Sequence, residues 1–189
     1  MQIKDYTYYH GTSRTNAALI MRNGFYQPPL VSKTDIIERN IKTGIGSLGI
    51  GVYAFCAIKE HALLFAHRKI KLEPAIISFK ILNDDYILNF TIPQTLRIYN
   101  EFLLSAYRTI QELKPKYSNK GYSKSLDGAI IETFMQFLMQ ENYVTHIQGV
   151  YKTSINNFGN YLNYSWIPNS IELCLKDISL INHATIQLA

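Results

Sequence analysis

The chain has 189 residues, of which 47% are hydrophobic and 17% charged, and its formal net charge is +5. This balance is typical of one folded domain over residues 1–189 and excludes a disordered chain. No apolar run approaches the ~20 residues of a membrane span, and the start lacks the layout of a signal peptide. We therefore expect a cytoplasmic protein with no membrane partner, whose positive charge is compatible with an anionic partner such as nucleic acid.

The first predicted elements are a strand and a helix. The run YTYYH at residues 6–10 is rich in aromatic residues, which favour strands. A helix follows, with Ser13 or Thr15 as its N-cap and Gly24 at its C-terminal end. The triplet His-Gly-Thr between them is either an ordinary turn before a helix cap or a place where the backbone meets a ligand.

A glycine-rich stretch, TGIGSLGIGVYAF at residues 43–55, leads into the next predicted strand. Helical spacing resumes in KEHALLFAHRKI, at residues 59–70. The run PAIISFKI, at residues 74–81, is typical of a buried strand. We therefore expect a strand, a helix and a second strand in this part of the chain.

The middle of the chain is predominantly helical. In residues 96–114 apolar side chains recur at i, i+3, i+4 and i+7, which predicts a strongly amphipathic helix. Residues 114–124, KPKYSNKGYSK, form a predicted basic loop with interleaved tyrosines. Residues 126–142 predict a second helix, although their isoleucine-rich start is also compatible with a strand. Together these segments form a helical insertion over about residues 93–142.

The last third of the chain contains short runs with turn residues between them, a pattern typical of strands. Such strands, following helices clustered earlier, indicate an α+β domain rather than alternating βαβ units. The predicted strands lie within residues 143–153, 160–167, 170–177 and 183–188.

The two cysteines, Cys56 and Cys174, lie far apart and have apolar neighbours. Their spacing matches neither a zinc site nor a disulfide framework. Since a free cysteine behaves as a small apolar residue, we expect both in the core and no dedicated metal site.

Three separated motifs carry residues that suit chemistry. They are His10, Gly11 and Thr12 after the first strand, Tyr53 in GIGVYAF, and Glu172 in NSIELCLKD. Each has a simpler interpretation by itself: a turn for the triplet, a core aromatic for the tyrosine, and a surface carboxylate on an edge strand for the glutamate.

Taken together and in this order, the motifs resemble the NAD-dependent ADP-ribosyltransferases of the PARP/diphtheria-toxin-like class, the His-Tyr-Glu class. The resemblance covers residues 8 to about 180, apart from the insertion. It implies split mixed β-sheets, with two packed sheets, flanking helices and a helical insertion. It also implies NAD as substrate and a glycosyltransferase reaction without a metal.

The chemistry of that reaction agrees with a fixed carboxylate. Cleavage of the nicotinamide–ribose bond builds positive charge on the ribose, as in glycoside hydrolysis. A carboxylate beside the ribose stabilises this charge more in the transition state than in the ground state, and it can accept a proton from the incoming nucleophile. The resemblance assigns this role to Glu172.

The resemblance also implies which residues bind NAD. The backbone at Gly11 would bond the nicotinamide amide, because glycine allows a close approach. His10 would bond a ribose hydroxyl with assistance from Thr12. Tyr53 would stack on the nicotinamide ring, and Phe65, on the helix after that strand, is the nearest candidate for a second stacking aromatic.

A second glutamate is an alternative catalytic residue. Glu132 stands in LDGAIIETF, and some ADP-ribosyltransferase-like toxins carry a similar segment before their last strands. Two residues before Glu172, where the family often has glutamine or glutamate, this chain has Ser170. That departure argues against arginine as the acceptor.

The resemblance further suggests a toxin of a toxin–antitoxin or antiviral (anti-phage) defence system, with an antitoxin or chaperone as a partner. Its favoured acceptor is a base of RNA or DNA, because lysines of the basic loop would meet phosphates and Tyr117 or Tyr122 would stack on an unpaired base. The loop is equally compatible with a plain solvated segment. A protein-directed transferase, an NAD glycohydrolase and a non-catalytic nucleic-acid-binding module remain alternatives.

Overall fold

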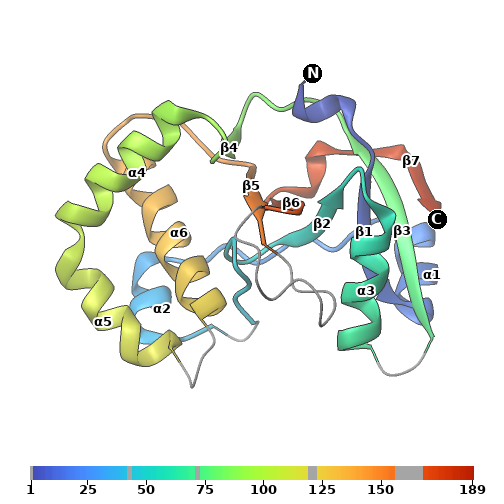
Figure 1. Cartoon of the computed structure of the whole chain (residues 1–189), viewed down its shortest axis with the longest axis horizontal. Helices are drawn as coiled ribbons and strands as arrows, with labels where there is room; N and C mark the ends of the chain where they lie inside the picture. The colour runs from blue at the N-terminus through green and yellow to red at the C-terminus, as the bar shows by residue number, and fades with distance from the viewer. Residues whose placement is uncertain (1, 42–43, 71–72, 119–122, 156–167) are drawn as a thin grey trace.

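The computed structural model describes residues 2–41, 44–70, 73–118, 123–155 and 168–189. In these ranges strands form a sheet at one end of the molecule and most helices gather at the other (Figure 1). The α+β class expected from the sequence is therefore confirmed. No helix among the described residues combines the length and the apolar character that crossing a membrane requires.

Within the described ranges, seven strands form one mixed sheet in the order β4-β5-β6-β2-β1-β3-β7, instead of the two packed sheets expected. β4 and β5 are parallel, and the other neighbours are antiparallel. The strands are β1 (Tyr8–Ser13), β2 (Val52–Cys56), β3 (Pro74–Ile81), β4 (Ile87–Asn89), β5 (Gly149–Ser154), β6 (Ser170–Leu175) and β7 (Ile181–Leu188).

The junction between β1 and β2 joins the two halves of this sheet. Its register pairs only Tyr8 with Cys56 and Tyr9 with Phe55 among the described residues. On its other side β1 pairs with β3 along all six of its residues. The two central strands therefore separate after Tyr9, yet they pair long enough to keep the sheet continuous.

Local sequence signals explain several boundaries. Strand β1 includes the His-Gly-Thr triplet, so the expected turn at this triplet is wrong. Ser13, and not Thr15, caps the first helix, because its side chain accepts a hydrogen bond from the backbone N–H of Asn16. Gly24 ends that helix with φ of +76°, which favours glycine.

The remaining helices differ from expectation in the middle of the chain. The single amphipathic helix expected over residues 96–114 is two helices that meet at Ala106. The predicted basic loop is partly helix, since residues 114–117 belong to the second of these. Residues 126–142 are helical up to residue 140, and residues 160–167 lie outside the described residues. The helices are α1 (Arg14–Asn23), α2 (Lys33–Glu38), α3 (Lys59–Lys69), α4 (Pro93–Ser105), α5 (Tyr107–Tyr117) and α6 (Ser123–Gln140).

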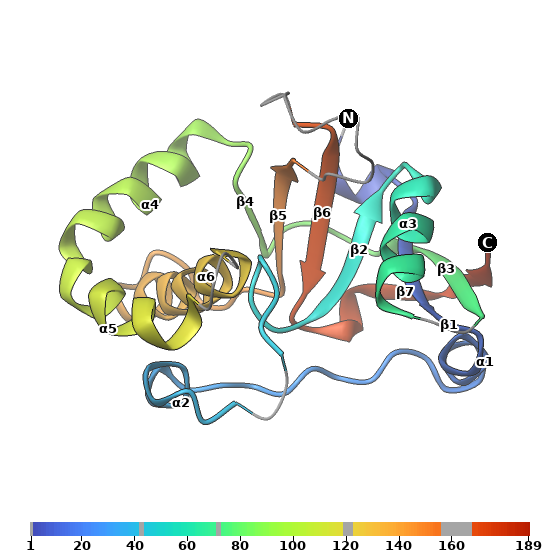
Figure 2. The same ribbon diagram turned by 60° about the horizontal axis from the view of Figure 1, so that its bottom comes forward.

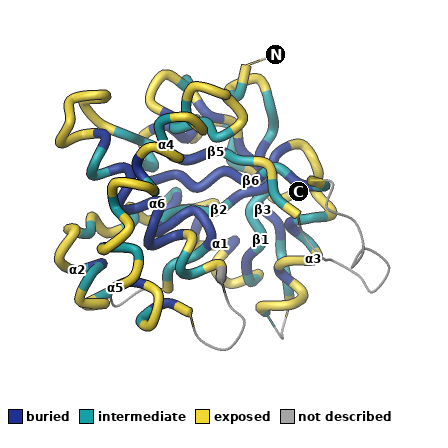
Figure 3. The backbone as a smooth tube through the Cα atoms, turned by 60° about the vertical axis from the view of Figure 1, so that its left-hand side comes forward, coloured by how far each residue is buried: buried dark blue, intermediate teal, exposed yellow. Residues whose placement is uncertain are grey.

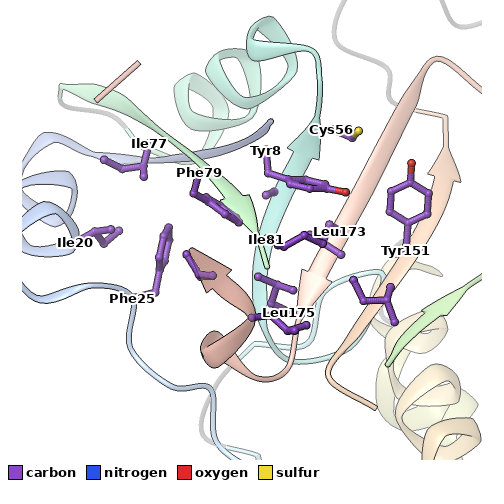
Figure 4. Close-up of a cluster of buried hydrophobic side chains, with 14 of the residues drawn as sticks. Tyr8, Ile20, Phe25, Cys56, Ile77, Phe79, Ile81, Tyr151, Leu173 and Leu175 are labelled. Atoms are coloured by element: carbon purple, nitrogen blue, oxygen red, sulfur yellow. The ribbon is translucent and has the colours of Figure 1, made fainter. Parts of the chain in front are cut away.

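The two faces of the sheet are covered differently. One face carries α1 and a hydrophobic cluster that contains Tyr8, Phe25, Phe79 and the leucines of β6 (Figure 4). In this cluster the rings of Tyr8 and Phe79 are stacked, and Phe25 meets Phe79 edge-on. The opposite face, called here the helical face, is covered by α3 and α6, which stand apart from each other (Figure 2). Five of the six residues of β6 are buried, while most residues of the outer helices α2 and α5 are exposed or half-buried (Figure 3). Cys56 and Cys174 are both buried in these clusters, as expected.

Candidate functional site

The three sequence motifs lie on three neighbouring strands in the centre of the sheet: β6, β2 and β1. Glu172 of β6 stands opposite Phe55 of β2 on one side and opposite Lys152 of β5 on the other. Because β6 is flanked by two strands and Glu172 is only 6% exposed, the edge-strand interpretation of this glutamate is wrong.

Strand register determines which side chains share a face. Directly opposed residues point to the same face and successive residues alternate. Glu172, Phe55 and Tyr53 therefore point to the helical face. His10 lies two residues from Tyr8, which packs in the opposite cluster, and its ring contacts Phe25 of that cluster. The structure thus brings the tyrosine and the glutamate together and leaves the histidine side chain at the junction, on the other face.

A pocket of about 310 Å³ opens beside Glu172 on the helical face. Ser47, Lys152, Lys124 and Asp127 are among its lining residues. Ser47 Oγ donates a hydrogen bond to Glu172 Oε2 at 3.0 Å. Loss of water raises the pKa of Asp127, and the two lysines act in the opposite direction. Side chains of both charges therefore line this pocket.

Tyr53 supports the wall of this site. Residues 46–51, called here the glycine turn, are closed by two backbone hydrogen bonds between Gly46 and Gly49. The Tyr53 hydroxyl accepts from the N–H of Leu48 at 2.7 Å and donates to the carbonyl of Gly49 at 2.8 Å. Burial raises the pKa of Tyr53. Its ring packs under the turn, and its stacking on a nicotinamide stays a prediction.

His10 links β1 to β2 beyond the point where the strands stop pairing. Its Nδ1 lies 2.7 Å from the carbonyl oxygen of Tyr53. A carbonyl only accepts, so Nδ1 carries the hydrogen, and in the neutral ring Nε2 is an acceptor. Burial lowers the pKa of His10, with the bond to Tyr53 opposing. A neutral ring whose Nε2 accepts suits a hydroxyl donor.

Gly11 has a structural reason to be glycine. A Cβ at this position would overlap the carbonyl oxygen of Ala62 and lie 3.1 Å from the Cβ of Ala66. Glycine therefore allows α3 to pack directly on β1. Thr12, the next residue, is buried as well. Contact of this backbone with a nicotinamide amide stays a prediction.

The second aromatic residue, Phe65, lies on α3. Its ring centroid is 6.0 Å from that of Phe55, which in turn stands opposite Glu172 in the sheet. Phe65 is 37% exposed, so part of its ring is available to a ligand. His61, one turn earlier on α3, contacts the same Phe55 ring.

Glu132 is engaged in a buried ion pair. Its Oε1 accepts from Lys176 Nζ at 2.6 Å and from the backbone N–H of Ile50 at 2.6 Å. Lys176 also donates to the carbonyls of Leu48 and Ile50, each at 2.8 Å. The lining of the pocket beside Glu172 does not include this pair. Of the two glutamates, Glu172 is therefore the one at the pocket.

Tyr117 does not lie where a base could stack on it. It is 5% exposed, and its hydroxyl donates to the carbonyl of Ile36 at 2.6 Å. The expected role of Tyr117 in base stacking is therefore wrong, because the tyrosine is part of the packing between α5 and α2. Tyr122 lies outside the described residues.

Sequence reasoning missed four residues of this region: Ser47, Asp127, Lys152 and Lys176. Strand alternation carries the signal for Lys176, since residues 172, 174 and 176 share a face. The proximity of Lys152 to Glu172 depends on the pairing of β5 with β6, which no local pattern indicates.

No group of three or more histidine, cysteine or acidic side chains among the described residues is arranged to hold a metal ion. Comparisons with models of protein families, with curated proteins and with solved structures found no match.

Proposed function

We propose that the chain is an NAD-dependent ADP-ribosyltransferase with Glu172 as its catalytic carboxylate. One observation carries the proposal: the His-Gly-Thr, tyrosine and glutamate motifs, far apart in sequence, lie on the adjacent strands β1, β2 and β6. Glu172 is buried, yet it lines a pocket together with charged side chains of both signs. A pocket of about 310 Å³ is within the usual range for small-molecule sites.

In the proposed reaction the bond between ribose C1′ and the nicotinamide nitrogen breaks, and its electron pair leaves with nicotinamide. The ribose becomes oxocarbenium-like, and Glu172 stabilises this positive charge in a site with little water. The acceptor attacks C1′ and loses its proton to a carboxylate or to solvent. Ser47 donates a hydrogen bond to Oε2 of Glu172 and so fixes the orientation of this carboxylate.

His10, Gly11, Thr12, Tyr53 and Phe65 are the proposed NAD-binding residues, and the ADP-ribosyltransferase fold is part of the proposal. His10 points to the face opposite Glu172, so its proposed contact with a ribose hydroxyl requires NAD to extend to the junction where β1 and β2 stop pairing. Its neutral ring, with Nε2 as an acceptor, suits such a contact. The exposed edge of Phe65 supports a stacking contact.

For the acceptor we propose an RNA or DNA base, which suits a cytoplasmic toxin of a toxin–antitoxin or anti-phage system with an antitoxin partner. Lys124 and Lys152 support a nucleic-acid acceptor, because they line the pocket with Glu172 and their positive charges attract phosphates. Tyr117 is buried and gives this acceptor no support.

The test uses NAD labelled in its adenylate part, incubated with separate RNA, DNA and protein fractions. The wild-type protein should transfer label to nucleic acid, and Glu172→Gln should lower the rate by about 100-fold or more. Glu101→Gln, which makes the same chemical change at an exposed site on α4, is the matched control. Label on protein would change the acceptor, and label only in free ADP-ribose would identify a glycohydrolase. Consumption of NAD at the same rate by wild type and Glu172→Gln would refute the assignment.

A further inference from the structure

The buried ion pair between Lys176 and Glu132 has no part in the proposed reaction. Both side chains are buried, with 9% of the Lys176 side chain and 7% of the Glu132 side chain exposed. An unpaired charge in this position would be strongly unfavourable. The pair is also unusually well bonded, since the ammonium group has three acceptors: the carboxylate and two backbone carbonyls.

In the described residues, the backbone groups that bond the two side chains of this pair belong to the glycine turn. Lys176 holds the carbonyls of Leu48 and Ile50, and Glu132 holds the N–H of Ile50. Among the described residues no backbone group of a strand or helix bonds these groups, so the two side chains replace regular secondary structure as their partners. The position of the turn therefore depends on the pair.

Glycines allow this close packing. Gly49 has φ of +91°, and a Cβ there would overlap Glu132 Oε1 and lie 2.6 Å from Lys176 Nζ. A Cβ at Gly128 of α6 would overlap the carbonyl oxygen of Gly46. The turn is thus fitted closely against α6 and against the ion pair that Glu132 of α6 forms with Lys176.

The turn in its bound position presents Ser47 to Glu172. Ser47 is one residue from Gly46 and one from Leu48, both of which are held, and its Oγ bonds Glu172 Oε2. We propose that the Lys176–Glu132 pair is a clamp that positions the glycine turn and, through Ser47, orients the carboxylate of Glu172. Lys176, Glu132 and Ser47 are positioning residues, and their effect on catalysis rests on the proposed function.

Two kinds of measurement test the clamp. Amide hydrogen exchange followed by NMR reports the turn without any substrate. Glu132→Ala and Lys176→Met should speed exchange of the Ile50 amide by about tenfold or more relative to the amides of β1 and β3, which the clamp does not contact. Glu132→Gln keeps an acceptor oxygen, so its exchange should stay much closer to that of the wild type.

Steady-state kinetics of NAD cleavage reports the effect on Glu172. Ser47→Ala should lower kcat by about tenfold, with little change in KM and with a normal exchange rate of the Ile50 amide. The reason is that it removes only the hydrogen bond from the turn to Glu172. Glu132→Gln should lose much less kcat than Glu132→Ala.

Three outcomes overturn the inference. The first is an exchange rate of the Ile50 amide in Lys176→Met that is unchanged, or that rises only as much as the rates of the β1 and β3 amides. The second is a kcat of Ser47→Ala equal to that of the wild type. The third is Glu132→Gln as inactive as Glu132→Ala with normal Ile50 exchange, because that would make Glu132 a group that acts on the substrate. A wild-type protein without activity on NAD would end the proposed function, and the exchange measurement would then decide the clamp alone.

Discussion

Replacement of Gly11 by alanine tests the contact between α3 and β1. The new methyl group would overlap the carbonyl oxygen of Ala62 and lie 3.1 Å from the Cβ of Ala66 and 3.2 Å from the carbonyl carbon of Ala62. The obstructing atoms are mainly helix backbone, so no flexible side chain can move aside. Accommodation requires α3 to move away from the strand.

The expected cost follows from that displacement. Overpacking a well-filled interior costs about 1–3 kcal/mol, and the upper part of this range applies because backbone must move. A loss of about 2–3 kcal/mol is large against a total stability of about 5–15 kcal/mol. With a urea m-value of about 2 kcal/mol/M, the unfolding midpoint should fall by about 1–1.5 M.

Urea unfolding followed by circular dichroism measures the midpoint. Gly44→Ala is the matched control, since a Cβ at Gly44 meets no atom within 4 Å among the described residues. Its midpoint should stay near that of the wild type. Equal midpoints for the two variants would refute the close packing of α3 on β1, and with it the structural reason for glycine at position 11.

Two further predictions concern single buried groups. Tyr117→Phe removes the hydrogen bond to the carbonyl of Ile36 and should lower the free energy of unfolding by about 1–2 kcal/mol in urea titrations. Tyr107 is exposed, so Tyr107→Phe should leave this free energy unchanged. Equal effects of the two substitutions would contradict the burial of Tyr117. Burial lowers the pKa of His10 in the folded protein below its ordinary value of 6.5. As the pH falls, the unfolded chain therefore binds a proton at His10 before the folded protein does. The stability that this provides is complete above about pH 6.5 and is lost as the pH falls toward the lowered value. The urea midpoints at pH 7.5 and pH 5.5 should therefore differ less in His10→Asn than in the wild type. Burial also lowers the pKa of His61, so a pH dependence of the same sign should remain in this variant. An unchanged difference between the two midpoints would refute the assignment to His10.

Local chemistry made part of the fold predictable from sequence. The cap at Ser13 and the glycine at position 24 depend on neighbouring residues, so both ends of α1 could be expected. The break between α4 and α5 could not, because it falls at Ala106, where no glycine or proline interrupts the apolar spacing. Pro115, which would suggest an end, lies inside α5. At these positions tertiary packing overrides local preference.

The candidate site was predictable in its motifs but not in its surroundings. Glu172 and Tyr53 stand out from their sequence context, and the sheet places them on one face. The burial of Tyr117 depends on the distant Ile36, and the partners of Glu132 depend on Lys176, 44 residues away. Contacts between such distant residues come from the strand order, which periodicity in one sequence does not determine.

The short pairing between β1 and β2 bears on how the molecule loses its structure. A chain opens in cooperative units, and boundaries between units fall where few backbone bonds cross. Two register pairs and the bond from His10 to Tyr53 join β1 to β2 in the described residues, whereas β1 pairs with β3 over six residues and β2 with β6 over four. The strands β1, β3 and β7 should therefore open as one unit and β2, β5 and β6 as another. The cluster that Tyr8 and Phe79 share with the leucines of β6, together with the bond from His10 to Tyr53, couples the two units.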